Sequence, residues 1–185
     1  SSTADYYAQF DTSSTYTTQG NEILRTYKDQ RTGQFLIGQQ YAIPYNYPPS
    51  TYVYWADPSL ALKDAQMGLM LKFSPYVLQL SNPADTFRLA GLRNIKYFPE
   101  AGTAGSQSND VVLFRYADIL LMKAECEVRL GTNLSDALML VNKIRERAYG
   151  NNLHDWALLD LTLDNILAER ARELAWEGYR RQDLI

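Results

Sequence analysis

The sequence predicts a mainly α fold, in which a tetratricopeptide-like helix pair is joined to a long irregular, aromatic-rich loop region. From residue 113 onward, apolar residues recur at steps of three and four, which is typical of amphipathic helices. Prolines and tyrosines crowd residues 41–55, and a content of 46% hydrophobic and 21% charged residues is that of a globular protein. We therefore expect a loop-rich, aromatic-rich part over 1–109 and a helical part over 110–185.

The first helix is predicted from an apolar face whose members are Leu113, Ala117, Leu120, Leu121, Ala124 and Val128. A second face carries Met122 and Cys126, so we expect neighbours to cover this helix on two sides, with Cys126 buried as a small apolar side chain. Gly131 fits the C-cap, because glycine adopts the left-handed conformation that ends many helices.

Two more helices follow. Asn133 is a suitable N-cap for the second helix, and Gly150 closes it. Because the turn between the first two helices is short, we expect them to form an antiparallel pair. The pair spans about 35 residues, the size of a tetratricopeptide unit. Thr162 is the expected N-cap of the third helix, with Asp164 in its first turn. We expect this helix to continue to Ile185, the end of the chain.

The N-terminal half gives weaker signals. We expect a short helical turn over 21–27, a polar turn over 28–33, a strand over 35–41 that Gly38 weakens, and a short extended piece over 95–98. The segment 41–55 contains five tyrosines, one tryptophan and three prolines, and the prolines exclude a regular helix there.

Glu169, Glu173 and Glu177 recur every four residues, a spacing at which like charges destabilise an isolated helix. One hypothesis is an acid/base pair in which one carboxyl has a raised pKa. The other is a salt-bridge lattice that fixes the helix packing, which would lower the carboxyl pKa values. The candidate cationic partners are Arg115, Arg145, Arg147, Arg170, Arg172 and Arg180. We favour the lattice.

Composition excludes several classes of site. A formal net charge of −3 argues against a nucleic-acid binder. One cysteine and one histidine, His154, give no pattern for a metal site or a Cys-His catalytic pair, so we predict no metal, no cofactor and no catalytic residue. No apolar run is long enough to cross a bilayer, and the sequence begins with no recognisable secretion signal.

Three ordered motifs of the helical part resemble the C-terminal portion of the SusD/RagB family of outer-membrane nutrient-binding lipoproteins. The first runs from Arg115 to Glu125. The second comprises Asn142, Arg145, Arg147 and Ala148. The third comprises Glu169, Arg170, Glu173, Glu177, Gly178, Arg180, Asp183 and Leu184. Weaker similarities lie at 29–31 and 91–97, and Arg181 stands where the family usually has an aromatic residue.

The resemblance implies a SusD-like helical fold and a fragment of a larger single protein. That protein would sit in the cell outer membrane, exposed at the cell surface, and would reach the membrane only through a lipid anchor absent from this chain. It would capture an oligosaccharide or polysaccharide and deliver it to a TonB-dependent, SusC-like outer-membrane transporter, without acting as an enzyme and without binding nucleic acid.

The matched motifs transfer no ligand residue, so the site prediction rests on composition. Aromatic rings stack on the flat C–H faces of sugars and carry hydrogen-bonding handles. The candidates are Tyr45, Tyr47, Tyr52, Tyr54 and Trp55. The alternative is that these rings pack the irregular half of the chain, while Trp156 and Trp176 are expected in the core. Two other functions stay open: a helical-repeat module that binds proteins, and, less favoured, a glycan-cleaving enzyme.

Overall fold

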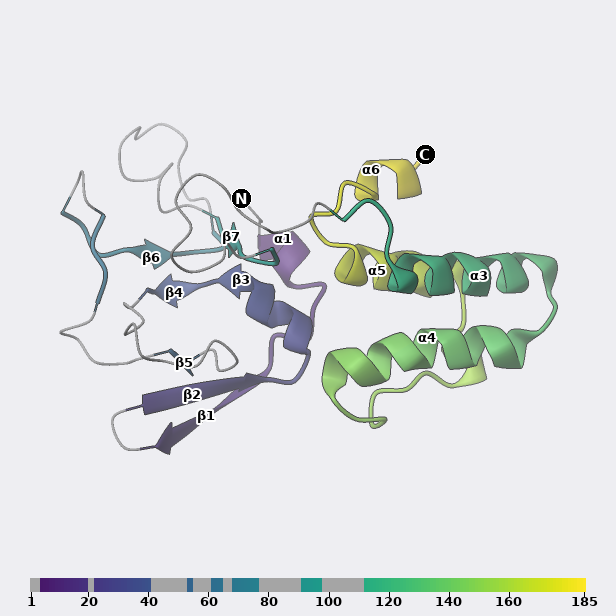
Figure 1. Cartoon of the computed structure of the whole chain (residues 1–185), viewed down its shortest axis with the longest axis horizontal. Helices are drawn as coiled ribbons and strands as arrows, with labels where there is room; N and C mark the ends of the chain where they lie inside the picture. The colour runs from purple at the N-terminus through teal and green to yellow at the C-terminus, as the bar shows by residue number, and fades with distance from the viewer. Residues whose placement is uncertain are drawn as a thin grey trace. The chain divides into compact units, whose positions relative to one another are not determined.

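The structure, a computed structural model, describes residues 4–19, 22–40, 53–54, 61–64, 68–76, 91–97 and 112–185. The chain forms two compact units, Ser1–Ile95 and Lys96–Ile185 (Figure 1). The expected division after residue 109 falls in a stretch outside the described residues, so it stays a prediction.

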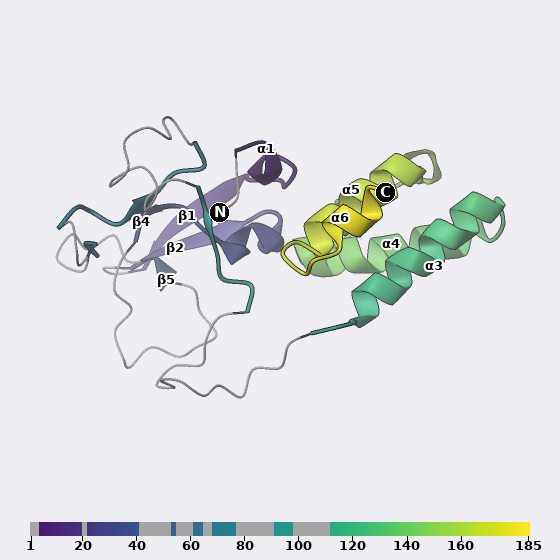
Figure 2. The same ribbon diagram turned by 90° about the horizontal axis from the view of Figure 1, so that it is seen from above.

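The second unit is built on an antiparallel helix pair, α3 (Tyr116–Leu130) and α4 (Leu134–Tyr149) (Figures 1 and 2). Gly131 ends α3 in the left-handed region, with φ of 65°, and its N–H donates to the carbonyls of Glu127 and Val128. Gly150 ends α4 in the same conformation, with φ of 72°. The tetratricopeptide-like helix pair is therefore present with the predicted ends, and the chain is mainly α.

The start of α4 differs from the expected cap. Asn133 occupies the N-cap position, but its φ is 51° and its side chain makes no capping hydrogen bond. Asparagine tolerates this left-handed conformation better than most residues, so its role here is to turn the chain between the helices.

Helix α5 (Leu163–Glu173) packs against α3. It follows the short 3-10 helix η3 (Leu158–Asp160) and begins as predicted, because the Thr162 hydroxyl accepts a hydrogen bond of 3.2 Å from the Asn165 N–H. The expected continuation to the end of the chain is wrong. The helix ends at Glu173, and a separate short helix, α6 (Arg180–Asp183), follows after a turn.

The break has a physical cause. In a continuous helix the carbonyls of Glu173 and Ala175 would accept hydrogen bonds from the N–H groups four residues later. Both carbonyls instead accept from the Lys96 ammonium, at 2.7 Å and 3.2 Å. The chain then leaves the helical path at Trp176 and Gly178, whose φ values are 64° and 85°.

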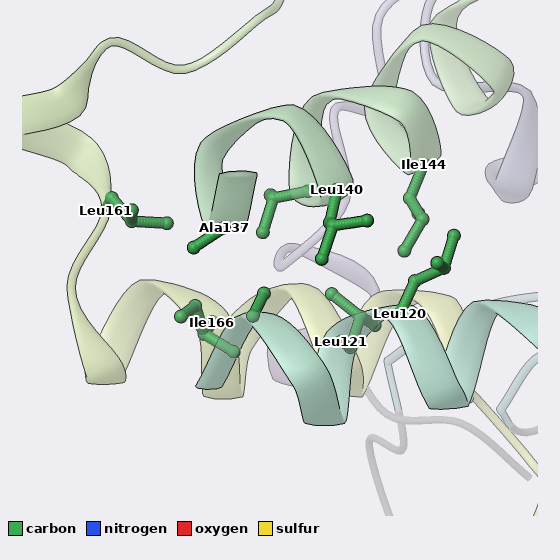
Figure 3. Close-up of a cluster of buried hydrophobic side chains, with 9 residues drawn as sticks. Leu120, Leu121, Ala137, Leu140, Ile144, Leu161 and Ile166 are labelled. Carbon is green, nitrogen blue, oxygen red and sulfur yellow. The ribbon is translucent and has the colours of Figure 1, made fainter. Parts of the chain in front are cut away.

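An apolar core joins helices α3, α4 and α5 (Figure 3). Leu120 and Leu121 from α3 face Ala137, Leu140 and Ile144 from α4, with Ile166 of α5 and the preceding Leu161 completing the cluster. Burial of each large aliphatic side chain stabilises the fold by roughly 1.5–3 kcal/mol. The apolar period read from the sequence thus identified the packed faces of the helices.

Some apolar positions are not buried as expected. Cys126 is exposed, Met122 is 38% exposed, and Leu113 lies exposed before α3 begins. Helix α3 packs against both α4 and α5, but the face with Met122 and Cys126 is exposed, so the prediction that neighbours cover this face is wrong. Among the residues that the structure describes, no helix is both long and apolar enough to cross a membrane.

The first unit contains the short helix α1 (Ala4–Tyr7) and a hairpin of strands β1 (Ser14–Gln19) and β2 (Glu22–Tyr27). The hairpin register joins Ser14 to Tyr27 and Gln19 to Glu22, and β2 also pairs with β5 (Val53–Tyr54). The predicted helical turn over 21–27 is wrong, because the segment pairs along its length with the threonine-rich β1 and strand context overrides weak local preference.

The predicted strand over 35–41 is two short strands with different partners. Strand β3 (Phe35–Leu36) pairs with β7 (Arg93–Asn94), and β4 (Gly38–Gln39) pairs with β6 (Lys72–Phe73). Gly38 has φ of 73°, a conformation that suits glycine and redirects the chain between the two pairings. The extended piece expected at 95–98 lies two residues earlier, at β7.

The polar turn at 28–33 is the 3-10 helix η1 (Gln30–Gln34). Asp29 is its N-cap and is fully buried, and its carboxylate accepts from the Arg31 guanidinium through two bonds of 2.9 Å. Beside it, Phe35 is buried with edge-to-face contacts to Tyr7 and Phe10. The weak motif at 29–31 therefore fixes the entry into β3.

Replacing Leu121 by alanine should destabilise the chain by about 2–5 kcal/mol, because the side chain is fully buried at the centre of the α3–α4 contact. Its neighbour Met122 is the matched control, and Met122→Ala should cost less than about 1 kcal/mol. Urea unfolding followed by helical circular dichroism measures both. Equal losses for the two variants would contradict the assigned helix faces.

Candidate functional site

The row of glutamates is buried rather than open to solvent. Glu169 is 0% and Glu173 is 2% exposed on α5, and the side chain of Glu177, in the turn after α5, is also 2% exposed. Burying three carboxylates is costly unless each gains cationic partners and hydrogen bonds. The chemistry of the site therefore depends on what faces these acids.

Glu169 faces α4. Its carboxylate lies 2.8 Å from Arg145 Nη1 and also accepts from Arg172, one turn along α5. Arg145 donates through Nε to the His154 carbonyl at 2.8 Å, and its guanidinium lies 5.0 Å from the ring centre of Trp156. This arginine thus connects α4, α5 and the linker between them.

Glu173 and Glu177 share one guanidinium. Arg115, at the N-cap of α3, places Nη1 2.6 Å from Glu173 and Nε 2.8 Å from the nearer Glu177 oxygen. Arg147 of α4 adds a second, more exposed cation to Glu173. Arg115 therefore links the start of α3 to the end of α5.

Lys96 is a partner that the charge pattern did not identify. Its ammonium lies 2.5 Å from the Glu177 carboxylate, in addition to the two backbone carbonyls that end α5. Burial lowers the pKa of Lys96, and the facing Glu177 opposes that effect. The only sequence signal for this role was the weak motif at 91–97, because Lys96 lies 77 residues before Glu173.

Two predicted partners face elsewhere. Arg170 lies on another face of α5 and binds Asp118 of α3 at 2.8 Å and Asp183 of α6 at 3.0 Å. Arg180 donates to the Leu167 carbonyl at 3.3 Å. The expectation that these two arginines face the glutamate row is therefore wrong. Arg170 instead attaches α3 and α6 to α5.

The electrostatics of Glu177 are those of a stabilised anion. Burial alone would raise the pKa of its carboxyl, but hydrogen bonds from Arg115 and Lys96 outweigh burial and hold the pKa below its ordinary value. At Arg115, the contacts with Glu177 and Glu173 outweigh burial and raise the pKa of the guanidinium. A general acid needs the opposite shift. The contacts confirm the salt-bridge lattice over the acid/base pair.

No group of three or more His, Cys, Asp or Glu side chains is placed to hold a metal ion among the residues that the structure describes. The predicted ligand residues Tyr45, Tyr47, Tyr52 and Trp55 lie outside those residues. The backbone of Tyr54 is described, and it pairs with Ile23 in the contact of β5 with β2. The aromatic site therefore stays a prediction.

The other two tryptophans differ from each other. Trp156 is half-buried against the helical core, and its backbone N–H and carbonyl bind the Asn142 side chain at 2.8 Å and 3.0 Å. Trp176 is 54% exposed, so its expected place in the core is wrong. Its positive φ carries the side chain out of the α5 path.

Comparison with known sequences identifies the family of this chain. A sequence profile described as the SusD family matches residues 79–185, more than half of the chain. The chain therefore belongs to the SusD family.

Three relatives come from Formosa agariphila. SusD-like protein P38 is 34% identical over 125 residues, which are 63% of this chain and 25% of that protein. SusD-like protein P25 is 40% identical over 84 residues, 43% of this chain and 16% of the relative. SusD-like protein P2 is 34% identical over 100 residues, 48% and 20% respectively. The matched part thus spans at most a quarter of each relative's length.

Replacing Glu173 by alanine should lower the melting temperature and cost about 3 kcal/mol or more, because it leaves Arg115 without one of its two buried carboxylates. Saccharide binding should be unchanged, since this side chain contacts the lattice. Glu125→Ala, which breaks an exposed pair with Arg129, is the control and should cost under about 1 kcal/mol. Thermal unfolding and calorimetric titration test both expectations. Normal stability with lost binding would refute the structural role.

The lowered pKa of Glu177 gives a pH dependence. Its stabilising effect is fully present above the ordinary glutamate pKa, about 4.3, and is lost as the pH falls from there through the lower folded-state value. The destabilisation caused by Glu177→Gln should therefore be constant near neutral pH and shrink below about pH 4.3. Urea unfolding across this range measures it. A penalty that grows on acidification would show that the pKa is raised instead.

Proposed function

We propose that the chain is part of a surface protein that captures oligosaccharides or a polysaccharide and delivers them to a TonB-dependent, SusC-like outer-membrane transporter. Membership of the SusD family over residues 79–185 is the observation that carries this proposal. The Formosa agariphila relatives are SusD-like proteins as well. We place the protein in the outer membrane, exposed at the cell surface and held by a lipid anchor.

The proposed mechanism is capture without bond cleavage. The buried carboxylates at 169, 173 and 177 are each paired with basic side chains. Proton transfer would need a carboxyl whose pKa is shifted toward neutrality, and the shift at Glu177 is in the other direction. Binding energy would come from ring stacking and from hydrogen bonds to sugar hydroxyls.

We assign the stacking rings to Tyr45, Tyr47, Tyr52, Tyr54 and Trp55. The segment that carries them contains three prolines, which restrict the backbone and reduce the entropy lost on binding. The short pairing of β5 with β2 ties one end of this segment to the hairpin. An aromatic-rich, proline-containing segment attached to a folded unit is a suitable place for a sugar site.

A second function, a helical-repeat module that binds another protein, is favoured by one feature of α3. Ile119, Met122, Cys126 and Leu130 follow each other at steps of three and four and are all exposed. Such an apolar stripe on a helix can pack against a second helix. In this alternative the aromatic segment would serve packing, and saccharides would not bind.

Calorimetric titration with a panel of glycans should give saturable heat with at least one saccharide, and Trp55→Ala should abolish the part of that heat that arises at the aromatic segment. Tyr76→Ala is the matched control, because Tyr76 is an exposed ring of the same unit outside the aromatic segment. Absence of heat across the panel would favour the interaction module. Release of reducing ends over time would show that the protein is an enzyme.

A further inference from the structure

The turn between α5 and α6 holds a tryptophan in an unusual backbone conformation. Trp176 has φ of 64°, in the left-handed region where glycine is least strained and bulky residues are rare. The side chain is 54% exposed, so full burial does not compensate for this strain. Strained residues persist where the surrounding structure determines their conformation, and they concentrate at binding sites.

Lys96 determines the conformation of this turn from both sides of Trp176. Its ammonium binds the carbonyl of Ala175, the residue before the tryptophan, at 3.2 Å. The same ammonium lies 2.5 Å from the carboxylate of Glu177, the residue after it. Arg115 holds that carboxylate from another direction at 2.8 Å. The indole is therefore presented by a backbone that has little freedom to move.

A second exposed ring belongs to the same clamp. Tyr97 directly follows Lys96 in the chain and is 48% exposed. The Tyr97 hydroxyl lies close to the Glu177 carboxylate. Its pKa is raised, mainly by burial and next by the negative charge of Glu177. Trp176 and Tyr97 are thus both attached to backbone positions that one buried ion pair, Lys96–Glu177, holds in place.

We propose that Trp176 and Tyr97 form a saccharide-stacking site of their own, separate from the aromatic segment 41–55. The proposal rests on the proposed glycan-binding function and adds a second, independent saccharide site to the chain. The matching ligand is an uncharged pyranose ring of an oligosaccharide, whose C–H face would lie on the indole while its hydroxyls bind the phenol.

This assignment explains why a large ring stands where the backbone favours glycine. Replacing Trp176 by glycine would relieve the left-handed strain. Two residues further on, a Cβ atom added at Gly178 would have no heavy atom within 4 Å. The turn is therefore open at the surface. A half-exposed indole gains most from a partner that covers it, and a rigid backbone reduces the entropy lost when that partner binds.

The test is fluorine NMR of the whole chain labelled with 5-fluorotryptophan, which gives one resonance for each of its three tryptophans. The probes are hexasaccharides of glucose, xylose, mannose and galactose. We expect the Trp176 resonance to shift saturably with at least one of them. Trp156, which is packed against the core, is the internal control and should not shift.

The variant Trp176→Gly separates a binding role from a structural one. It removes the ring and relieves the strained φ, so the melting temperature should stay the same or rise. Affinity for the responding hexasaccharide should fall about 3- to 10-fold, the loss expected for one stacking contact. A clear drop in melting temperature would overturn the proposal, because the indole would then serve packing.

The remaining outcomes distinguish this inference from the proposed function. If only the Trp55 resonance shifts, glycan capture stands and the site at Trp176 is refuted. If no resonance shifts with any hexasaccharide, both the site and the glycan-binding function fail. If Trp176 shifts and Trp176→Gly keeps full affinity, the ring senses binding elsewhere and the proposal is also refuted.

Discussion

The fold of the helical unit depends on the contact of Arg115 with Glu173 and Glu177. This guanidinium binds carboxylates 58 and 62 residues away in the chain, and so joins the start of α3 to the end of α5. The acids would repel each other without it, and buried unpaired charges would cost several kcal/mol. Lys96 and Arg147 complete the neutralisation from two further segments. Planar guanidinium groups suit this task because they satisfy two acceptors with fixed geometry.

The polar residues of the family motifs are explained by these contacts. Most of them bind another motif residue or a backbone group: Arg115, Asp118, Asn142, Arg145, Arg147, Glu169, Arg170, Glu173, Glu177, Arg180 and Asp183. The spacing of the motif residues therefore reflects which helix faces pack against each other. Arg170, for example, reaches Asp118 on one side and Asp183 on the other, so one residue sets the positions of α3 and α6 relative to α5.

Local patterns in the sequence predicted what depends on local physics. The apolar period and the glycine caps predicted the helices α3 and α4. Thr162 predicted the start of α5, and the row of glutamates predicted the salt-bridge lattice. The end of α5 could not be predicted in this way, because the competing donor, Lys96, comes from 77 residues earlier. The strand β2 was missed for a similar reason, since its partner rather than its own sequence decides its state. Cys126 has a helical apolar spacing, yet its side chain is exposed.

The buried ion pairs of the lattice hold backbone segments of the helical unit in fixed positions. The lowered pKa of Glu177 makes its carboxyl a poor proton donor, and the ion pairs of the buried acids join the helices to one another. Rigidity has a use at the turn after α5, where the contacts of Lys96 and Arg115 fix the backbone around an exposed indole. Strain at that residue is tolerated because breaking the surrounding ion pairs would cost more than the strain itself. The same buried charges that hold the helices together can therefore also hold a recognition surface in place.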